Sequence, residues 1–166
     1  MQTLNVGAGR SDAEYKAAEN ERRADLRAES QSDANYFFWA AGLAALGTSL
    51  LPIRLNILVS VGALDLLAFY GRSLGAFYPL LLYGVSATWV AALIGLGFAA
   101  RGAHRWAFLA GIVLYGSDMI PLIGTFSLWA FSIHSFFVFK WFQGQRALKD
   151  LNEEGASEPK AQGAAS

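Results

Sequence analysis

The chain has 166 residues, 54% of them apolar, and its 13 basic and 13 acidic side chains balance. It contains no cysteine, which excludes disulfides, thiolate metal sites and cysteine nucleophiles. A net charge of zero without a basic cluster argues against nucleic acid as a partner.

A polar arm covers residues 1–35, and we expect a helix within it over about 12–31. Ser11 and Glu14 fit a capping box, in which each side chain satisfies a free backbone N–H of the first helical turn. Glu19 and Arg23 form a favourable pair one turn apart. A cleaved signal peptide starts with a short basic stretch, so an apolar run behind this arm should stay in the membrane.

Long stretches of the chain carry no charge. No charged residue occurs between Asp33 and Arg54, between Arg72 and Arg101, or over 119–139. An apolar helix of about 18 residues or more can cross roughly 30 Å of hydrocarbon. A domain this small has too thin a core to bury three such runs. The sequence therefore predicts an all-α fold, a polytopic transmembrane helical bundle, with the lipid bilayer as its partner.

Apolar segments bounded by proline or glycine make up a predicted transmembrane domain over 36–143. The five segments are 36–51, 57–70, 77–100, 106–123 and 125–142. Pro121 and Gly124 predict the last turn, because proline stops a helix and glycine permits the reversal. The polar tail, 144–166, is expected to be disordered from about residue 153.

The distribution of Lys and Arg favours four crossings over five. If the short segment 57–70 does not cross, only Arg54 and Arg72 lie outside and both termini are cytoplasmic. If all five segments cross, the basic residues divide about evenly and the C-terminus lies outside; this alternative stays open. Four crossings also place three interface anchors, Trp39, Trp106 and Trp141, at the inner membrane surface.

Small residues recur along the segment 77–100 at helical spacing. They are Gly84, Ala87, Thr88, Ala91, Ala92, Gly95 and Ala99. Such rows let two helix backbones approach closely in lipid, where apolar burial gives no gain. The pattern fits packing within one subunit, and it also fits a face for a homo-oligomer or another membrane subunit.

Ionisable residues at membrane depth are costly and by default suggest a site. Asp118 and His134 fall on neighbouring predicted helices, and Asp65 lies in the short segment. As a pair, Asp118 and His134 could relay a proton, since a carboxylate orients an imidazole. With a turn at Pro121–Gly124 their depths differ by about 7–8 Å, so a direct bond requires an asymmetric turn. Alternatively, each is satisfied by a nearby hydroxyl or backbone group.

Motifs that would identify an enzyme are missing. There is no glycine-rich phosphate loop and no His-Glu-x-x-His, and the only histidines are His104 and His134, which excludes a histidine-rich metal site. We therefore expect no catalytic residues, no metal and no cofactor.

Several short stretches are similar to those of known membrane proteins. They are Tyr36–Leu43, Gly97–Arg101, Arg105–Phe108, Val113–Asp118, His134–Phe136 and Gln145–Leu148. Over roughly 36–151 the chain resembles a broad group of uncharacterised bacterial multi-pass membrane proteins with four to five helices. The resemblance implies a location in the bacterial inner membrane and this helix layout, without an activity or a ligand.

The sequence leaves three candidate functions open. The first is a non-enzymatic membrane assembly or interaction component, suggested by the small-residue rows. The second is a small proton-linked transporter or permeation protein that uses Asp118 and His134. A membrane enzyme ranks last.

Overall fold

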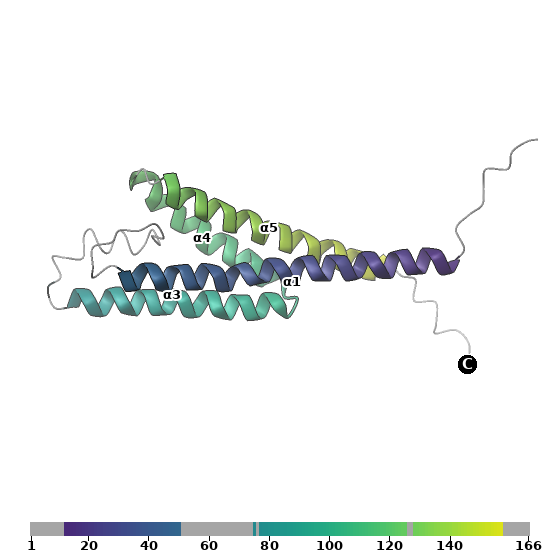
Figure 1. The fold of residues 1–166 in the computed structure, drawn as a ribbon, viewed down its shortest axis with the longest axis horizontal. Coiled ribbons are helices and arrows are strands. Elements are labelled where there is room, and N and C mark those ends of the chain that lie inside the picture. The colour runs from purple at the N-terminus through teal and green to yellow at the C-terminus, as the bar shows by residue number, and fades with distance from the viewer. Residues whose placement is uncertain (1–11, 51–74, 76, 126–127, 158–166) are drawn as a thin grey trace, which may run out of the picture.

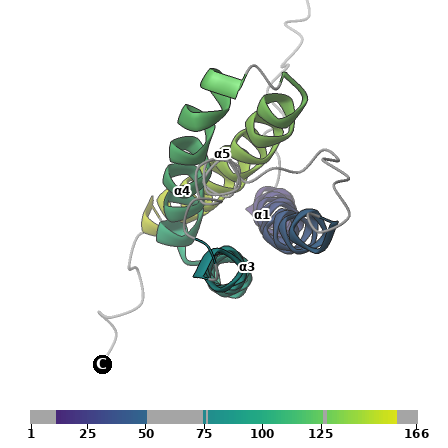
Figure 2. The same ribbon diagram turned by 90° about the vertical axis from the view of Figure 1, so that its left-hand side faces the viewer.

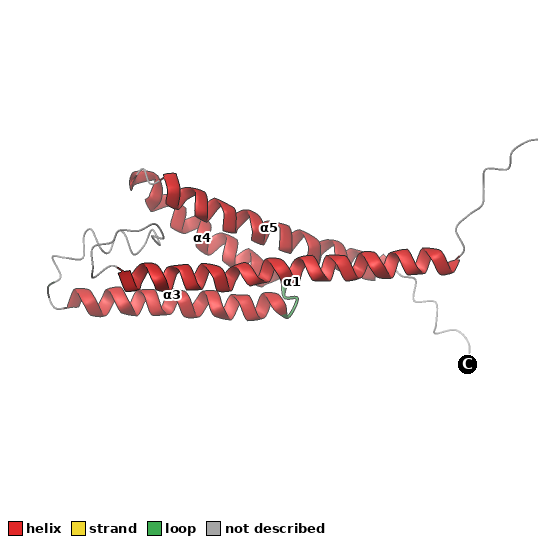
Figure 3. Cartoon of the chain, in the orientation of Figure 1, coloured by secondary structure: helices red, strands yellow, loops and turns green. Residues whose placement is uncertain are grey.

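The computed structural model describes residues 12–50, 75, 77–125 and 128–157. Within these ranges it contains four helices and no strand: α1 (Asp12–Leu50), α3 (Phe77–Arg101), α4 (Arg105–Thr125) and α5 (Leu128–Ser157) (Figure 3). The predicted all-α fold is confirmed. The segment 57–70, together with Asp65, Arg54 and Arg72, lies outside the described residues.

The helix α1 is continuous over 39 residues, whereas the sequence suggested one helix over 12–31 and another over 36–51. Residues 32–35 contain neither proline nor glycine, so nothing in them interrupts the backbone hydrogen bonds. At 1.5 Å per residue, α1 is about 58 Å long, and its polar and apolar parts form a single rod.

The helices alternate in direction along the bundle (Figure 1). Seen end-on, α1 and α3 lie beside each other, and the pair α4 and α5 lies beside both (Figure 2). The polar start of α1 and the polar end of α5 extend from the same end of the bundle.

A tight turn reverses the chain between α3 and α4. The amide nitrogens of Gly102, Ala103 and His104 donate to carbonyls in the last turn of α3, and Ala103 has a φ of 60°. These bonds satisfy carbonyl groups that the end of a helix leaves open.

The connection between α4 and α5 lies later than predicted. Proline at 121 was expected to end the helix, but the backbone of α4 continues to Thr125 and α5 begins at Leu128. At the other end, α5 is helical to Ser157, beyond the point near 153 where we expected order to end.

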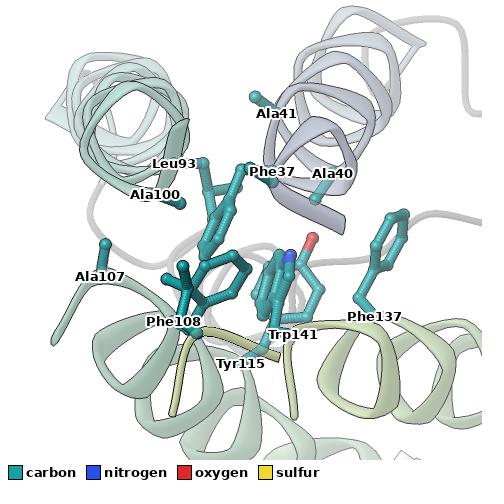
Figure 4. Packing of buried hydrophobic residues seen from close by; sticks show 12 residues of the cluster. Phe37, Ala40, Ala41, Leu93, Ala100, Ala107, Phe108, Tyr115, Phe137 and Trp141 are labelled. Atoms are coloured by element: carbon teal, nitrogen blue, oxygen red, sulfur yellow. The ribbon is translucent and has the colours of Figure 1, made fainter. Parts of the chain in front are cut away.

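Aromatic side chains fill the middle of the core (Figure 4). Phe37 of α1 stacks on Trp141 of α5 at 4.1 Å between ring centroids, and Phe108 of α4 lies against Phe37. Glycine makes the space for this cluster, because a Cβ atom on Gly111 would lie 2.4 Å from the Phe37 ring. Trp141 is 0% exposed, so its predicted role as an interface anchor is wrong.

The other two predicted anchors lie on the surface. Trp39 is 67% exposed and Trp106 is 57% exposed. Sequence spacing placed all three tryptophans near one end of the bundle, but it could not show that Trp141 faces α1 and α4 rather than outward.

Candidate functional site: a buried Asp118–His134 pair

Asp118 of α4 and His134 of α5 are in direct contact. The His134 Nε2 atom lies 2.9 Å from Asp118 Oδ2, and the two side chains are 2% and 1% exposed, respectively. The position of the inter-helix connection explains the contact. Asp118 lies seven residues before the end of α4 and His134 six after the start of α5. The two residues are therefore nearly level, with an offset of about 1.5 Å instead of the 7–8 Å expected from a turn at Pro121–Gly124.

Both ring nitrogens of His134 face oxygen atoms, which fixes the number of protons at the site. Nδ1 lies 2.9 Å from the carbonyl oxygen of Ala130, and a carbonyl can only accept, so Nδ1 carries a hydrogen. One further proton lies in the bridge between Nε2 and the Asp118 carboxylate. Either a neutral imidazole accepts it from a carboxylic acid, or an imidazolium donates it to a carboxylate. In both cases the pair has no net charge, which is the form that tolerates burial.

The ring of Tyr115 packs against the imidazole of His134, in addition to the two contacts made by the ring nitrogens. The Tyr115 ring stacks on His134 at 4.6 Å between centroids and meets Trp141 edge-on at 5.0 Å. Tyr115 precedes Asp118 by three residues and therefore lies on the same face of α4. Sequence reasoning did not select Tyr115, although this spacing was the available signal.

A second buried polar contact joins α1 to α3. The hydroxyl groups of Thr48 and Ser86 lie 2.5 Å apart, and Thr48 also donates to the carbonyl of Ala44. Sequence spacing gives no sign that these two hydroxyl groups, which lie on different helices, would meet.

The small-residue face of α3 points away from the described helices. Its residues Gly84, Ala87, Thr88, Ala91, Ala92 and Gly95 are exposed and Ala99 is half-buried. Instead, α3 packs through Leu82, Ser86, Leu93, Gly97 and Ala100. A Cβ atom on Gly84 or Gly95 would meet no atom within 4 Å. Within the described part of the chain, this face is therefore not used for packing from Gly84 to Gly95, whereas Ala99 at its end packs against the core.

Polar contacts gather where the apolar part of the bundle ends. Lys140 of α5 lies 3.7 Å from Asp33 of α1, beside Gly144, where a Cβ atom would lie 2.9 Å from the Asp33 Cβ. Burial raises the pKa of Asp33, and attraction to Lys140 partly opposes the shift. Farther along the polar part, Arg22 of α1 pairs with Glu154 of α5 at 2.8 Å. Ion pairs thus join α1 to α5 beyond the aromatic core.

The described residues include no group of three or more His, Asp or Glu side chains that could hold a metal ion. By length and composition, one helix of the described part, α3, can cross a membrane. No protein family, curated protein or solved structure matches the chain. The resemblance to bacterial inner-membrane proteins therefore stays a prediction.

Proposed function

We propose that the protein is an integral membrane helical bundle that acts as a non-enzymatic assembly or interaction component. Large apolar side chains on the surface of every described helix support the membrane location. They include Trp39 and Leu46 on α1, Leu80 and Phe98 on α3, Val113 and Ile120 on α4, and Phe136, Phe139 and Phe142 on α5. A soluble monomer rarely exposes apolar surface on all sides, whereas lipid covers such a surface without cost.

The proposed topology has four crossings, with both termini on the cytoplasmic side of a bacterial inner membrane. The opposite directions of α1 and α3 support it, because one further span between them would make them parallel. Arg101 ends α3 and Arg105 begins α4, and these helix ends point toward the end of the bundle from which the polar parts of α1 and α5 extend (Figure 1). Lys140 lies 3.7 Å from Asp33 of the polar arm. Positive charge on one side favours placing that side in the cytoplasm.

The proposed assembly role is based on the small-residue face of α3, which points outward. Glycine and alanine on a lipid-facing surface give up side-chain contacts, but they let a second helix approach closely. The same face on a second copy is complementary to it around a two-fold axis. We therefore propose that a second copy of the chain, packed on α3, is the partner to test first.

The test is the oligomeric state in bilayers, measured by single-molecule photobleaching of the labelled protein. Because the chain has no cysteine, one introduced cysteine gives a single labelling site. The variant Gly84→Leu/Gly95→Leu should weaken the dimerisation constant about tenfold, equivalent to about 1.4 kcal/mol, and so lower the dimer fraction at a given protein density. Matched controls are Gly42→Leu and Gly116→Leu on α1 and α4, where a Cβ atom also meets nothing within 4 Å. A wild-type monomer, or equal effects of all four substitutions, would refute the assembly role.

A second candidate function, proton-linked transport or permeation, is supported by the 2.9 Å contact between His134 and Asp118. The bridge holds one proton that could shift between two buried groups. Proteoliposomes containing a pH-sensitive dye would test it. Proton flux above that of empty liposomes, reduced by Asp118→Asn and by His134→Ala, would support this function. Flux equal to that of empty liposomes would reject it.

A further inference from the structure

A hollow of about 360 Å³ opens between α1 and the end of α3, at the level where the apolar surface gives way to charge. Its lining residues are Asn35, Phe38, Trp39 and Arg101. It lies apart from the Asp118–His134 pair and from the small-residue face of α3.

Arg101 is fixed in this hollow by two kinds of contact. Its Nε and Nη2 groups donate to the Asn35 side-chain oxygen at 3.1 and 2.5 Å, and its guanidinium carbon lies 4.6 Å from the centre of the Phe38 ring. A guanidinium has five N–H donors, and these two bonds use only two of them. The remaining donors have no partner among the described residues, so the cation is oriented in advance for a further acceptor.

Among the described residues, neither Arg101 nor Arg105 forms an ion pair with an acidic side chain. No Asp or Glu occurs between Leu66 and Ser117, a stretch that includes Arg101, His104 and Arg105. Asp33, two residues before Asn35 on α1, pairs with Lys140 of α5. The Arg105 Nε atom is also buried without a partner among the described residues. The hollow beside Arg101 would therefore attract an anion as its ligand.

The walls of the hollow are aromatic and open to the apolar surface. Trp39 lines it and is 67% exposed, while Phe98, which meets Phe38 edge-on at 5.2 Å, is 63% exposed. Indole rings prefer the boundary between headgroups and hydrocarbon. A ligand here would meet a cation at one end and apolar surface at the other, which is the chemistry of a phospholipid rather than of a free ion.

We propose that this hollow binds the phosphate group of an anionic phospholipid of the cytoplasmic leaflet, through the free donors of Arg101. The glycerol and the start of the acyl chains pack against Trp39 and Phe98. The inference rests on the membrane location proposed above.

The experiment is native mass spectrometry of the full chain in mild detergent, with phosphatidylglycerol or phosphatidylcholine added at equal concentration. A hydrogen bond to a charged group contributes about 1.5–3 kcal/mol, so Arg101→Gln should lower retention of phosphatidylglycerol at least tenfold. Arg101→Lys keeps the positive charge but loses the planar guanidinium with its parallel N–H donors. This variant should retain an amount of phosphatidylglycerol between those of wild type and Arg101→Gln. Lys149→Gln removes the same charge from an exposed position on the polar part of α5 and should change nothing.

Inorganic phosphate and short-chain phosphatidylglycerol are then compared as competitors. Displacement by the short-chain lipid at concentrations where inorganic phosphate has no effect supports a lipid site. Equal potency of the two competitors would identify a free-anion site and overturn the proposal. Equal retention by wild type and Arg101→Gln would also overturn it.

Resistance to alkaline carbonate extraction, measured on the same variants in cell membranes, separates this inference from the proposed function. If carbonate releases the wild type, the membrane location fails, and the lipid site fails with it. If wild type and Arg101→Gln both resist extraction but retain phosphatidylglycerol equally, only the lipid site fails.

Discussion

The Asp118–His134 pair makes a quantitative prediction for a double-mutant cycle. Asp118→Ala removes the group that faces His134 Nε2, and His134→Phe removes the imidazole while keeping an aromatic ring against Tyr115. In the double variant neither polar group remains, and the smaller alanine offsets the larger phenylalanine ring. Replacing both members of a buried polar pair by apolar groups is often nearly neutral, whereas removing one leaves the other without its partner.

The size of each effect follows from the geometry. Hydrogen bonds between membrane helices average about 0.6 kcal/mol and reach about 1.7 kcal/mol. The side chains of Asp118 and His134 are 1–2% exposed, so water cannot replace a lost partner. The free-energy cost of the unsatisfied group is therefore larger than the energy of the hydrogen bond itself. Because the intact pair is neutral, that cost is about 1–3 kcal/mol rather than that of an isolated charge. We expect each single variant to lose about 2–3 kcal/mol and the double variant to lie within about 1 kcal/mol of wild type.

Unfolding of the purified protein in mixed micelles by increasing SDS, followed by far-ultraviolet circular dichroism, measures these free energies. Equal helical content at zero SDS shows that each variant starts folded. A double variant that loses the sum of the two single losses would show that the groups do not depend on each other, and the assignment of one shared proton would then fail.

Two further predictions concern packing and pH in the same unfolding assay. Gly111→Ala should lose about 1–3 kcal/mol, because its Cβ atom would lie 2.4 Å from the Phe37 ring, whereas Gly116→Ala has open space and should gain up to about 1 kcal/mol. Equal effects of the two substitutions would show that α1 and α4 are not in close contact at Gly111. The pKa of Asp33 is raised above its ordinary value of 3.8, so the stabilisation from its protonated form is complete below pH 3.8 and is lost as the pH rises through the higher folded-state pKa. The stability of the wild type relative to Asp33→Asn should therefore fall as the pH rises above 3.8, and a difference between the two that does not change with pH would contradict the shift.

Helix content was accessible from sequence because it depends on local features. Charge-free apolar runs predicted helices where α3, α4 and the apolar parts of α1 and α5 lie, and the capping box at Ser11 and Glu14 predicted a start near Asp12. The boundaries were harder to predict, because a single proline does not always end a helix. The backbone passes Pro121 and reaches Thr125, and this difference decides whether Asp118 and His134 are level.

Which side of each helix faces inward could not be predicted from periodicity alone. Apolar residues surround the helices on all sides, so the pattern does not distinguish the core face from the outer face. Trp141 was assigned to the surface and lies in the core, stacked on Phe37. The small residues of α3 fitted an inner face as well as an outer one. The buried hydroxyl pair of Thr48 and Ser86 depends on how α1 and α3 align, which neither helix specifies by itself.

The unbroken course of α1 has a mechanical consequence. A helix without a proline or a flexible joint moves as a rigid rod, so a tilt of its apolar half must appear at its polar end. Asp12 lies 24 residues from Tyr36, about 36 Å along the axis. A tilt of about 10° around Tyr36 would therefore swing the start of α1 by roughly 6 Å. The ion pair between Arg22 and Glu154 connects this lever arm to α5, so a change of angle deep in the bundle would be transmitted to two helices at once.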